Sequence, residues 1–142
     1  MARTRSHPRP TSWIRTSYRR AIAIPVVAFV GALLTDWAYS KSANVMWSNG
    51  SGWLLLVGLL GCGLALMLLA LATRDGEVIE GRWVPVVVLL GAFVVQIVNF
   101  MVHMRDGWTA VVPAGMLLSV TGAAIILVAA WLSRTTGGEV RS

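Results

Sequence analysis

The chain has 142 residues, of which 56% are hydrophobic and 13% are charged, and its formal net charge is +6. A composition this apolar excludes an ordinary soluble domain of the same length and is typical of an integral membrane protein. The positive charge does not indicate a nucleic-acid-binding protein, because it is concentrated in a terminal tail that has no recognition motif.

Residues 1–20 are rich in Arg, Ser, Thr and Pro and hold six of the twelve basic residues. A segment of this kind cannot bury enough apolar surface to fold alone. The sequence therefore predicts a disordered cytoplasmic tail that is attracted to anionic lipid headgroups. A second, short cytoplasmic tail is predicted for residues 134–142.

Four apolar stretches follow the first tail, at about 21–39, 52–73, 83–103 and 110–132. Each is long enough to cross a bilayer as a helix, which takes about 20 residues. Residues 21–133 are thus predicted to form an all-α integral membrane domain, an up-down bundle of four transmembrane helices. Small residues spaced four apart mark the expected contacts between helices. They are Ala28 and Ala32, Gly58 and Cys62, Gly61 and Ala65, and Gly115, Ser119 and Ala123.

Short internal similarities predict two duplicated helical hairpins. The stretch "GALLTDWAY" from Gly31 and the stretch "GAFVVQIVNF" from Gly91 both lead towards a loop with polar residues. Trp53 and Trp108 are both expected at the entrance to the helix that follows. Since both hairpins run in the same sense, the repeat would be parallel.

Tryptophan and basic residues predict the orientation in the membrane. All seven tryptophans fall at or beyond the ends of the predicted spans, where amphipathic rings favour the interface with water. Lys41 and Arg105 are the only basic residues in two of the loops, whereas the tails and the middle loop hold the other ten. Basic loops stay in the cytoplasm. The sequence therefore predicts a multi-pass protein of the inner (plasma) membrane with both termini cytoplasmic.

Polar residues inside the spans are few. The third span carries Gln96, Asn99 and His103 at spacings of three and four, so they share one face that steps outwards to the external surface. Asp36 lies near the outer end of the first span. An ionisable group in the hydrocarbon region is costly unless it is paired. Asp36 is therefore expected to face the bundle and to find a donor. His103 and Arg105 are the available donors, and His103 is expected to face inward towards Asp36.

The candidate site is a polar cluster on the external side. Its members are Asp36, Asn99, His103, Arg105, Asp106 and Trp108, with Tyr39 and Trp47 at its border and Gln96 as a residue that could line a path. A purely structural role suits the same residues, because pairing of intramembrane groups serves folding and "RDG" is good turn chemistry.

No catalytic motif accompanies the cluster, so no catalytic residue is assigned and the sequence does not indicate an enzyme. Too few ligands are present for a closed zinc site, and no metal site is predicted. One membrane histidine cannot supply two imidazoles to a haem, although His103 with Met101 or Met104 could ligate one. Cys62 is alone and is expected to be a buried core residue. The expectation is no cofactor, with haem or a quinone left open.

The stretches "AIPVVAFVGALLTDWAY", "MWSNGSGWLLLVGLL" and "NFMVHMRDGWTAVVPAGMLLSV" resemble the family of predicted membrane proteins catalogued as domain of unknown function 2231, over about residues 21–132. The resemblance implies four spans. It also implies that a subgroup of the family retains the same residues, without a known role for them: Asp36, Asn99, His103, Arg105 and Asp106. Some members look like partners or fused segments of electron-transfer proteins, such as Rieske iron–sulfur domains, cytochromes c or periplasmic quinoprotein dehydrogenases. Many members have a histidine two residues before the first-span proline. Ala23 stands there, ahead of Pro25, so a haem role is not implied for this chain.

Three hypotheses of function follow. The first is a non-enzymatic membrane subunit that anchors a periplasmic redox partner, with homo-oligomerisation left open. The second is a small transport or proton-conducting bundle, in which Gln96, Asn99 and His103 line a path. The inner half of that span, "WVPVVVLLGAFVV", has no polar group to continue such a path. The third is a purely structural membrane assembly protein.

Overall fold

The computed structural model describes residues 11–74, 83–105 and 111–135. Within these ranges all regular structure is helical, as the sequence predicts. The elements are α1 (Thr11–Ala21), α2 (Ala23–Ser42), α3 (Val45–Arg74), α4 (Trp83–Arg105), the short irregular helix η1 (Val111–Gly115) and α5 (Met116–Thr135). Four of the described helical segments are long and apolar enough to cross a membrane. The predicted four-helix membrane domain is confirmed at this level.

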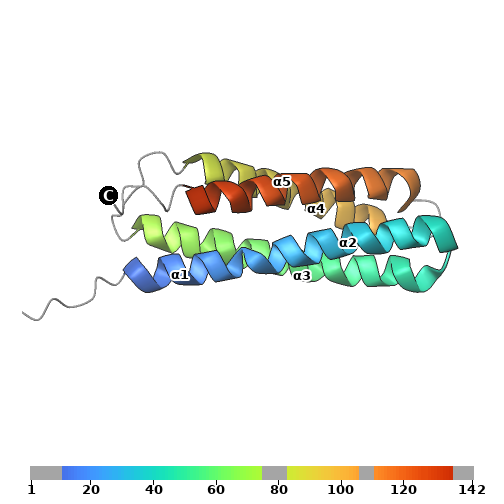
Figure 1. The fold of residues 1–142 in the computed structure, drawn as a ribbon, viewed down its shortest axis with the longest axis horizontal. Helices are drawn as coiled ribbons and strands as arrows, with labels where there is room; N and C mark the ends of the chain where they lie inside the picture. Colours follow the sequence, from blue (N-terminus) through green and yellow to red (C-terminus); the bar gives the residue numbers. More distant parts are fainter. Residues whose placement is uncertain (1–10, 75–82, 106–110, 136–142) are drawn as a thin grey trace, which may run out of the picture.

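The spanning helices form an up-down bundle in which each helix has two main neighbours (Figure 1). Helix α2 packs against α3 and α5, and α4 packs against the same two helices from the other side. We call the end of the bundle that carries Thr11 and Thr135 the terminal end. The opposite end, where α2 turns into α3, is the turn end (Figure 1). The ends of the described chain thus lie on one side, as the predicted topology requires.

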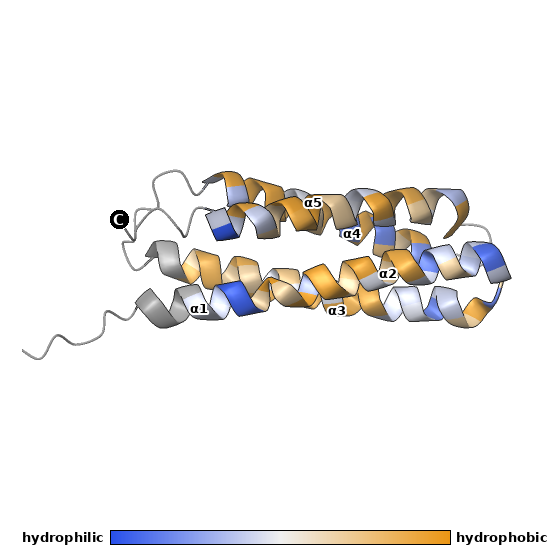
Figure 2. Cartoon of the chain, in the orientation of Figure 1, coloured by the Kyte–Doolittle hydropathy of each residue, from blue (hydrophilic) through white to orange (hydrophobic). Residues whose placement is uncertain are grey.

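The outer surface of the bundle is apolar. Figure 2 shows hydrophobic residues along the middle of the helices and hydrophilic residues mainly towards the two ends. Large side chains such as Val27, Leu60 and Leu117 are more than half exposed. Exposed apolar surface of this extent is expected for a protein that faces lipid. Four tryptophans, Trp37 and Trp53 towards the turn end and Trp83 and Trp131 at the terminal end, are likewise more than half exposed.

Small residues let the helices approach closely, as predicted. Gly58 of α3 lies against the ring of Phe29 on α2, and a Cβ atom at Gly58 would be 2.1 Å from Phe29 Cε1. At Gly61 the same atom would be 2.9 Å from Pro25 Cδ. The other predicted contact residues are also buried: Ala28, Ala32, Cys62, Ala65, Gly115, Ser119 and Ala123. Close backbone approach of this kind replaces the hydrophobic driving force that is missing in lipid.

The prediction of a disordered tail over residues 1–20 is wrong for residues 11–20, which form α1. Helix α1 runs almost directly into α2 through Ile22, whose backbone is helical. Ala21 and Ile22 are buried, and Tyr18 packs against the same core. The Tyr18 hydroxyl also lies 3.1 Å from Ser133 Oγ of α5. These contacts bury apolar surface of the segment, although its composition is mostly polar. Residues 1–10 lie outside the described residues.

Helix α3 begins well before the predicted span at 52. The turn from α2 consists of Ala43 and Asn44. Ala43 has a left-handed backbone (φ 51°) and donates its N–H to the Tyr39 carbonyl at 2.8 Å. The Asn44 side-chain oxygen accepts the N–H of Met46 at 3.0 Å, which caps the start of α3. Trp53 consequently lies about two turns inside α3, and its prediction as a helix-entrance residue is wrong.

The start of the fourth span is irregular. Val112 has an extended backbone (φ −123°, ψ 121°) within η1. Proline disfavours a helical backbone in the residue before it, and Pro113 follows Val112. The regular helix therefore begins at Met116, several residues after the predicted start at 110.

Candidate functional site

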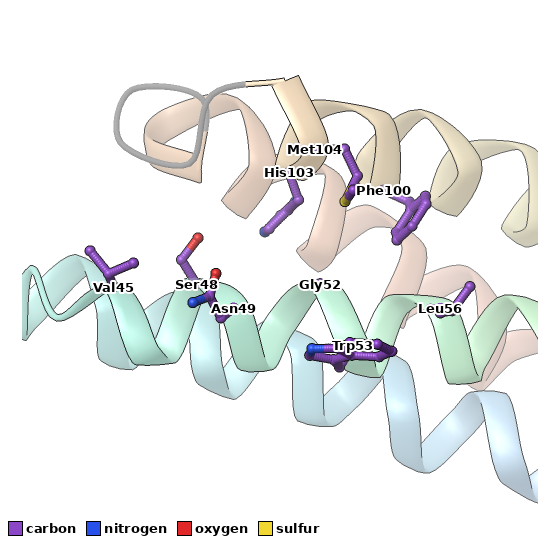
Figure 3. A pocket seen from close by; sticks show the side chains of 9 residues that line it. All are labelled: Val45, Ser48, Asn49, Gly52, Trp53, Leu56, Phe100, His103 and Met104. Carbon is purple, nitrogen blue, oxygen red and sulfur yellow. The ribbon is translucent and has the colours of Figure 1, made fainter.

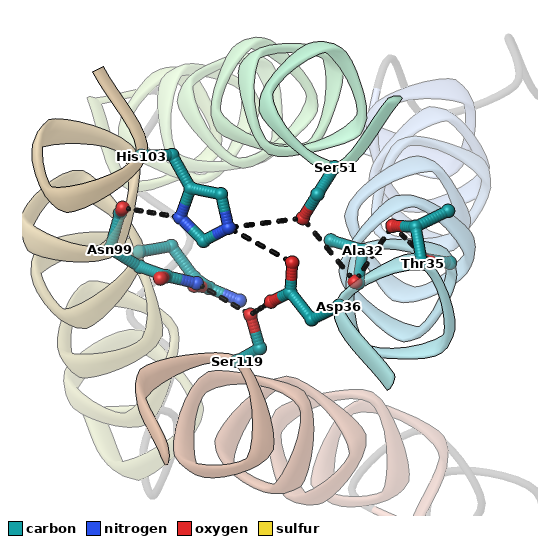
Figure 4. Close-up of polar contacts among 9 residues, drawn as sticks. Ala32, Thr35, Asp36, Ser51, Asn99, His103 and Ser119 are labelled. Carbon is teal, nitrogen blue, oxygen red and sulfur yellow. Dashed lines mark hydrogen bonds and ion pairs between the residues drawn. The ribbon is translucent and has the colours of Figure 1, made fainter. Parts of the chain in front are cut away.

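Near the turn end, all four spanning helices contribute polar side chains to one buried network (Figure 4). Its members are Asp36 of α2, Ser51 of α3, Gln96, Asn99 and His103 of α4, and Ser119 of α5. His103 is 8% exposed and the other five are fully buried. The helical repeat explains why these residues face inward. On α4 the three polar residues continue the buried stripe of Pro85, Leu89 and Ala92, and on α2 Asp36 follows Phe29 and Ala32.

A pair of ionisable side chains lies at the centre of the network. His103 Nε2 is 2.9 Å from Asp36 Oδ1, and His103 Nδ1 is 3.0 Å from the backbone oxygen of Asn99. Both partners are hydrogen-bond acceptors, so both ring nitrogens fit the role of donor. The geometry therefore suits an imidazolium against a carboxylate. Their charges cancel, which reduces the cost of burying either one in a membrane.

Two serines complete the hydrogen bonding of this pair. Ser119 Oγ donates to Asp36 Oδ2 at 2.5 Å and accepts from Asn99 Nδ2 at 2.8 Å. Ser51 Oγ lies 3.3 Å from His103 Nε2 and donates to the Ala32 carbonyl, also at 3.3 Å. Each serine thus links a member of the pair to a neighbouring helix. Sequence reasoning missed both roles: it treated Ser119 as a small packing residue and placed Ser51 in a loop.

The network ends at Gln96, whose side-chain oxygen accepts from Asn99 Nδ2 at 2.9 Å. Gln96 lies against Gly122 of α5, where a Cβ atom would come within 2.4 Å of Gln96 Nε2. Gln96 Nε2 and Asn99 Oδ1 have no hydrogen-bond partner among the described residues. Phe29, Leu89 and Ile126 are among the fully buried residues of the apolar core. The polar network is therefore confined to the turn-end part of the bundle.

The structure brings together Asp36, Asn99 and His103 of the predicted cluster, and it adds Gln96 to them. His103, not Arg105, is the donor to Asp36. Arg105 is exposed and contributes no described hydrogen bond to the network. Asp106 and Trp108 lie outside the described residues. Of the two predicted border residues, Tyr39 is buried one turn after Asp36, and Trp47 is exposed on the outer surface of α3.

A pocket between α3 and α4 reaches His103 from the outside of the bundle (Figure 3). Its volume is about 510 Å³. Its polar side chains gather in the part nearer the turn end, where Val45 also lies, and the side chains along the rest are apolar. The polar residues are Ser48, Asn49 and His103, and the others include Val45, Gly52, Trp53, Leu56, Phe100 and Met104. Trp53 and Met104 are both more than two-thirds exposed, so the pocket opens sideways, towards lipid in a membrane. We call it the α3/α4 pocket.

No family model matches this chain, and no curated protein or solved structure matches it significantly. Membership of the family that the sequence resembles therefore stays a prediction. In the described part of the chain, no group of three His, Cys, Asp or Glu side chains is placed to hold a metal ion.

Proposed function

We propose that this protein is a non-enzymatic membrane subunit that binds a quinone in the α3/α4 pocket and holds it for a redox partner on the external side. One observation carries the proposal: a pocket that opens towards lipid has hydrogen-bonding residues at one end and apolar residues along the rest. A quinone has a flat ring with carbonyl acceptors and an apolar tail. It is dissolved in the bilayer, from which a sideways opening admits it.

The lining residues suit such a ligand. The Ser48 hydroxyl and the Asn49 amide are donors for a ring carbonyl, while Leu56 and Phe100 offer apolar contact to the ring and tail. Figure 3 shows Ser48 and His103 extending towards each other from the two helices. A volume of about 510 Å³ falls within the range of about 300–1,000 Å³ that is usual for small-molecule sites.

The buried pair behind the pocket supports a role in positioning. Hydrogen bonds to Asp36 and to the Asn99 backbone hold both nitrogens of His103, so its ring presents a fixed wall to the pocket. The same bonds weigh against a haem ligand, since axial ligation needs a free ring nitrogen. A quinone is therefore the better candidate of the two cofactors.

The transport hypothesis is less well supported. A conducting path needs polar groups or a water-filled space across the membrane. The described network stops at Gln96, and fully buried Phe29, Leu89 and Ile126 belong to the apolar core. A purely structural network is the remaining alternative, and it predicts no bound ligand.

Mass spectrometry of an organic extract tests the proposal on protein that is purified from quinone-containing membranes in mild detergent. We expect about one quinone per chain. Gly52→Leu should abolish binding, because it adds a side chain to the pocket lining where no other atom lies within 4 Å of the new Cβ. Gly63→Leu is the matched control: it lies on the same helix with equally open surroundings but outside the pocket. Wild-type protein without quinone, or equal quinone in both variants, would refute the proposed ligand.

The redox partner requires a separate experiment. We expect chemical cross-linking in native membranes, followed by purification, to recover an electron-transfer protein with the wild-type chain. Recovery of quinone without any redox protein would leave the binding site intact and would contradict the anchoring role.

A further inference from the structure

The terminal end of the bundle carries a second pocket, of about 210 Å³, between the start of α2 and the end of α5. Val26, Val27 and Ala130 give it apolar walls. Two arginines line it as well, Arg19 from α1 and Arg134 from α5, and both are exposed. These arginines are far apart in the sequence, and the packing of α2 against α5 brings them to one place.

The charge of the chain is concentrated in three stretches of the sequence. Ten of the twelve basic residues, but only four of the six acidic ones, lie in the sequence before Ala21, from position 74 to 82, or after Leu132. This distribution leaves no net charge on the rest of the chain. Among the described residues the one acidic side chain is Asp36, which lies in the network near the turn end. No described carboxylate therefore competes for Arg19 and Arg134.

We propose that this pocket binds one anionic phospholipid, with its phosphate between Arg19 and Arg134 and an acyl chain along Val26 and Val27. The planar guanidinium group matches the oxygens of a phosphate, and a charge-assisted contact is stronger than a neutral one. Helix ends of a membrane bundle lie at headgroup level, where long arginine side chains reach polar groups while their stems cover apolar surface. The apolar walls lead from that level towards the hydrocarbon region.

The same geometry selects against a zwitterionic lipid. Phosphatidylcholine also has a phosphate, but its quaternary ammonium would lie close to two cationic side chains. Phosphatidylglycerol has the phosphate without that cation. Preference for the anionic headgroup is thus an expected property of the pocket, and it does not depend on the α3/α4 pocket or its ligand.

Native mass spectrometry of the full chain in detergent tests this site, with added phosphatidylglycerol or phosphatidylcholine of identical acyl chains. We expect one retained phosphatidylglycerol and weaker binding of phosphatidylcholine. Arg19→Gln and Arg134→Gln should each lower the affinity for phosphatidylglycerol about fivefold, the effect of one basic residue near an anionic headgroup. Arg20→Gln is the matched control, since Arg20 is exposed beside Arg19 but does not line the pocket. It should leave the affinity unchanged.

A second comparison tests the acyl-chain half of the site. Glycerol 3-phosphate, which has the phosphate but no chain, should not displace the bound lipid. Ala23→Leu, which enlarges an exposed residue in the lining, should weaken lipid binding while thermal stability stays at the wild-type value. Equal affinity for the two lipids, equal losses in Arg19→Gln and Arg20→Gln, or displacement by glycerol 3-phosphate would each overturn the proposal.

Discussion

Asp36 and His103 are 67 positions apart in the chain, yet their side chains meet with 2.9 Å between Oδ1 and Nε2 (Figure 4). Both side chains are almost completely inaccessible, at 0% and 1% exposure. Helices in lipid gain little from the hydrophobic effect between them, so packing and hydrogen bonds decide which faces meet. This pair is therefore a principal determinant of how α2 and α4 are arranged around the bundle axis.

Removing both members of the pair should cost much less than the sum of the costs of removing each one alone. Asp36→Leu or His103→Leu leaves one buried group without its partner, at a cost of about 3–5 kcal/mol. The double variant leaves no unpaired charge, and it should lose much less than the sum of the two single losses. Unfolding in detergent, followed by tryptophan fluorescence, measures all three. Strictly additive losses would contradict the pairing. Arg105→Leu, at an exposed position outside the network, should have little effect.

The hydroxyl group of Ser119 should contribute to stability. Ser119→Ala removes the donor to Asp36 and the acceptor for Asn99, and buried groups left without partners cost about 1–3 kcal/mol. Thr121→Ala is the control on the same helix, because the Thr121 hydroxyl is exposed and donates only to the Leu117 carbonyl. Its effect should stay within about 0.5 kcal/mol. Equal unfolding midpoints for the two variants would show that the hydrogen bonds of Ser119 do not stabilise the bundle.

Two glycines of α3 should respond oppositely to the same substitution. Gly58→Ala places a methyl group 2.1 Å from the Phe29 ring and should destabilise the protein by about 1–3 kcal/mol. Gly63→Ala meets no atom within 4 Å and should be neutral or stabilising by up to about 1 kcal/mol, because alanine favours helix. The comparison uses one helix and one chemical change. A stable Gly58→Ala variant would show that α2 and α3 do not approach as closely as described.

The predicted orientation can be tested with single cysteines. Native Cys62 is fully buried and should not react with a membrane-impermeant maleimide. Lys41→Cys at the turn end should be labelled in spheroplasts with an intact plasma membrane. Thr135→Cys at the terminal end should be labelled only after permeabilisation, because basic segments stay in the cytoplasm. The reverse pattern would place the polar network on the cytoplasmic side.

The sequence predicts the bundle and four of the six residues of its polar network, for a definite physical reason. Spans are set by length and hydropathy, and the face of α4 is set by its helical repeat, so Gln96, Asn99 and His103 could be placed together. The cost of an unpaired carboxylate then requires a partner for Asp36. Because His103 shares the inward face with Gln96 and Asn99, the sequence also predicts that it faces Asp36, and in the structure His103, not Arg105, is the donor to Asp36.

Other features depend on packing between distant segments. Ser51 lies in "SNGS", a stretch that reads as a loop, yet α3 extends through it because Asn44 caps the helix further upstream. Helix α1 is not predicted, because its arginines and serines give the segment the composition of a disordered tail. Tyr18 nevertheless packs on the core. The α3/α4 pocket depends on the separation of two helices, and a local sequence pattern cannot predict that separation.

The network is divided between the two hairpins, so its hydrogen bonds can form only after the second hairpin has been synthesised. The first hairpin carries Asp36, while both side chains that bond its carboxylate, His103 and Ser119, belong to the second. His103 is translated 67 residues after Asp36, a delay of roughly 3–13 s at about 5–20 residues per second. During that interval the unpaired carboxylate favours water at the membrane surface. We therefore expect the turn end of the first hairpin to stay at the interface until α4 and α5 are inserted.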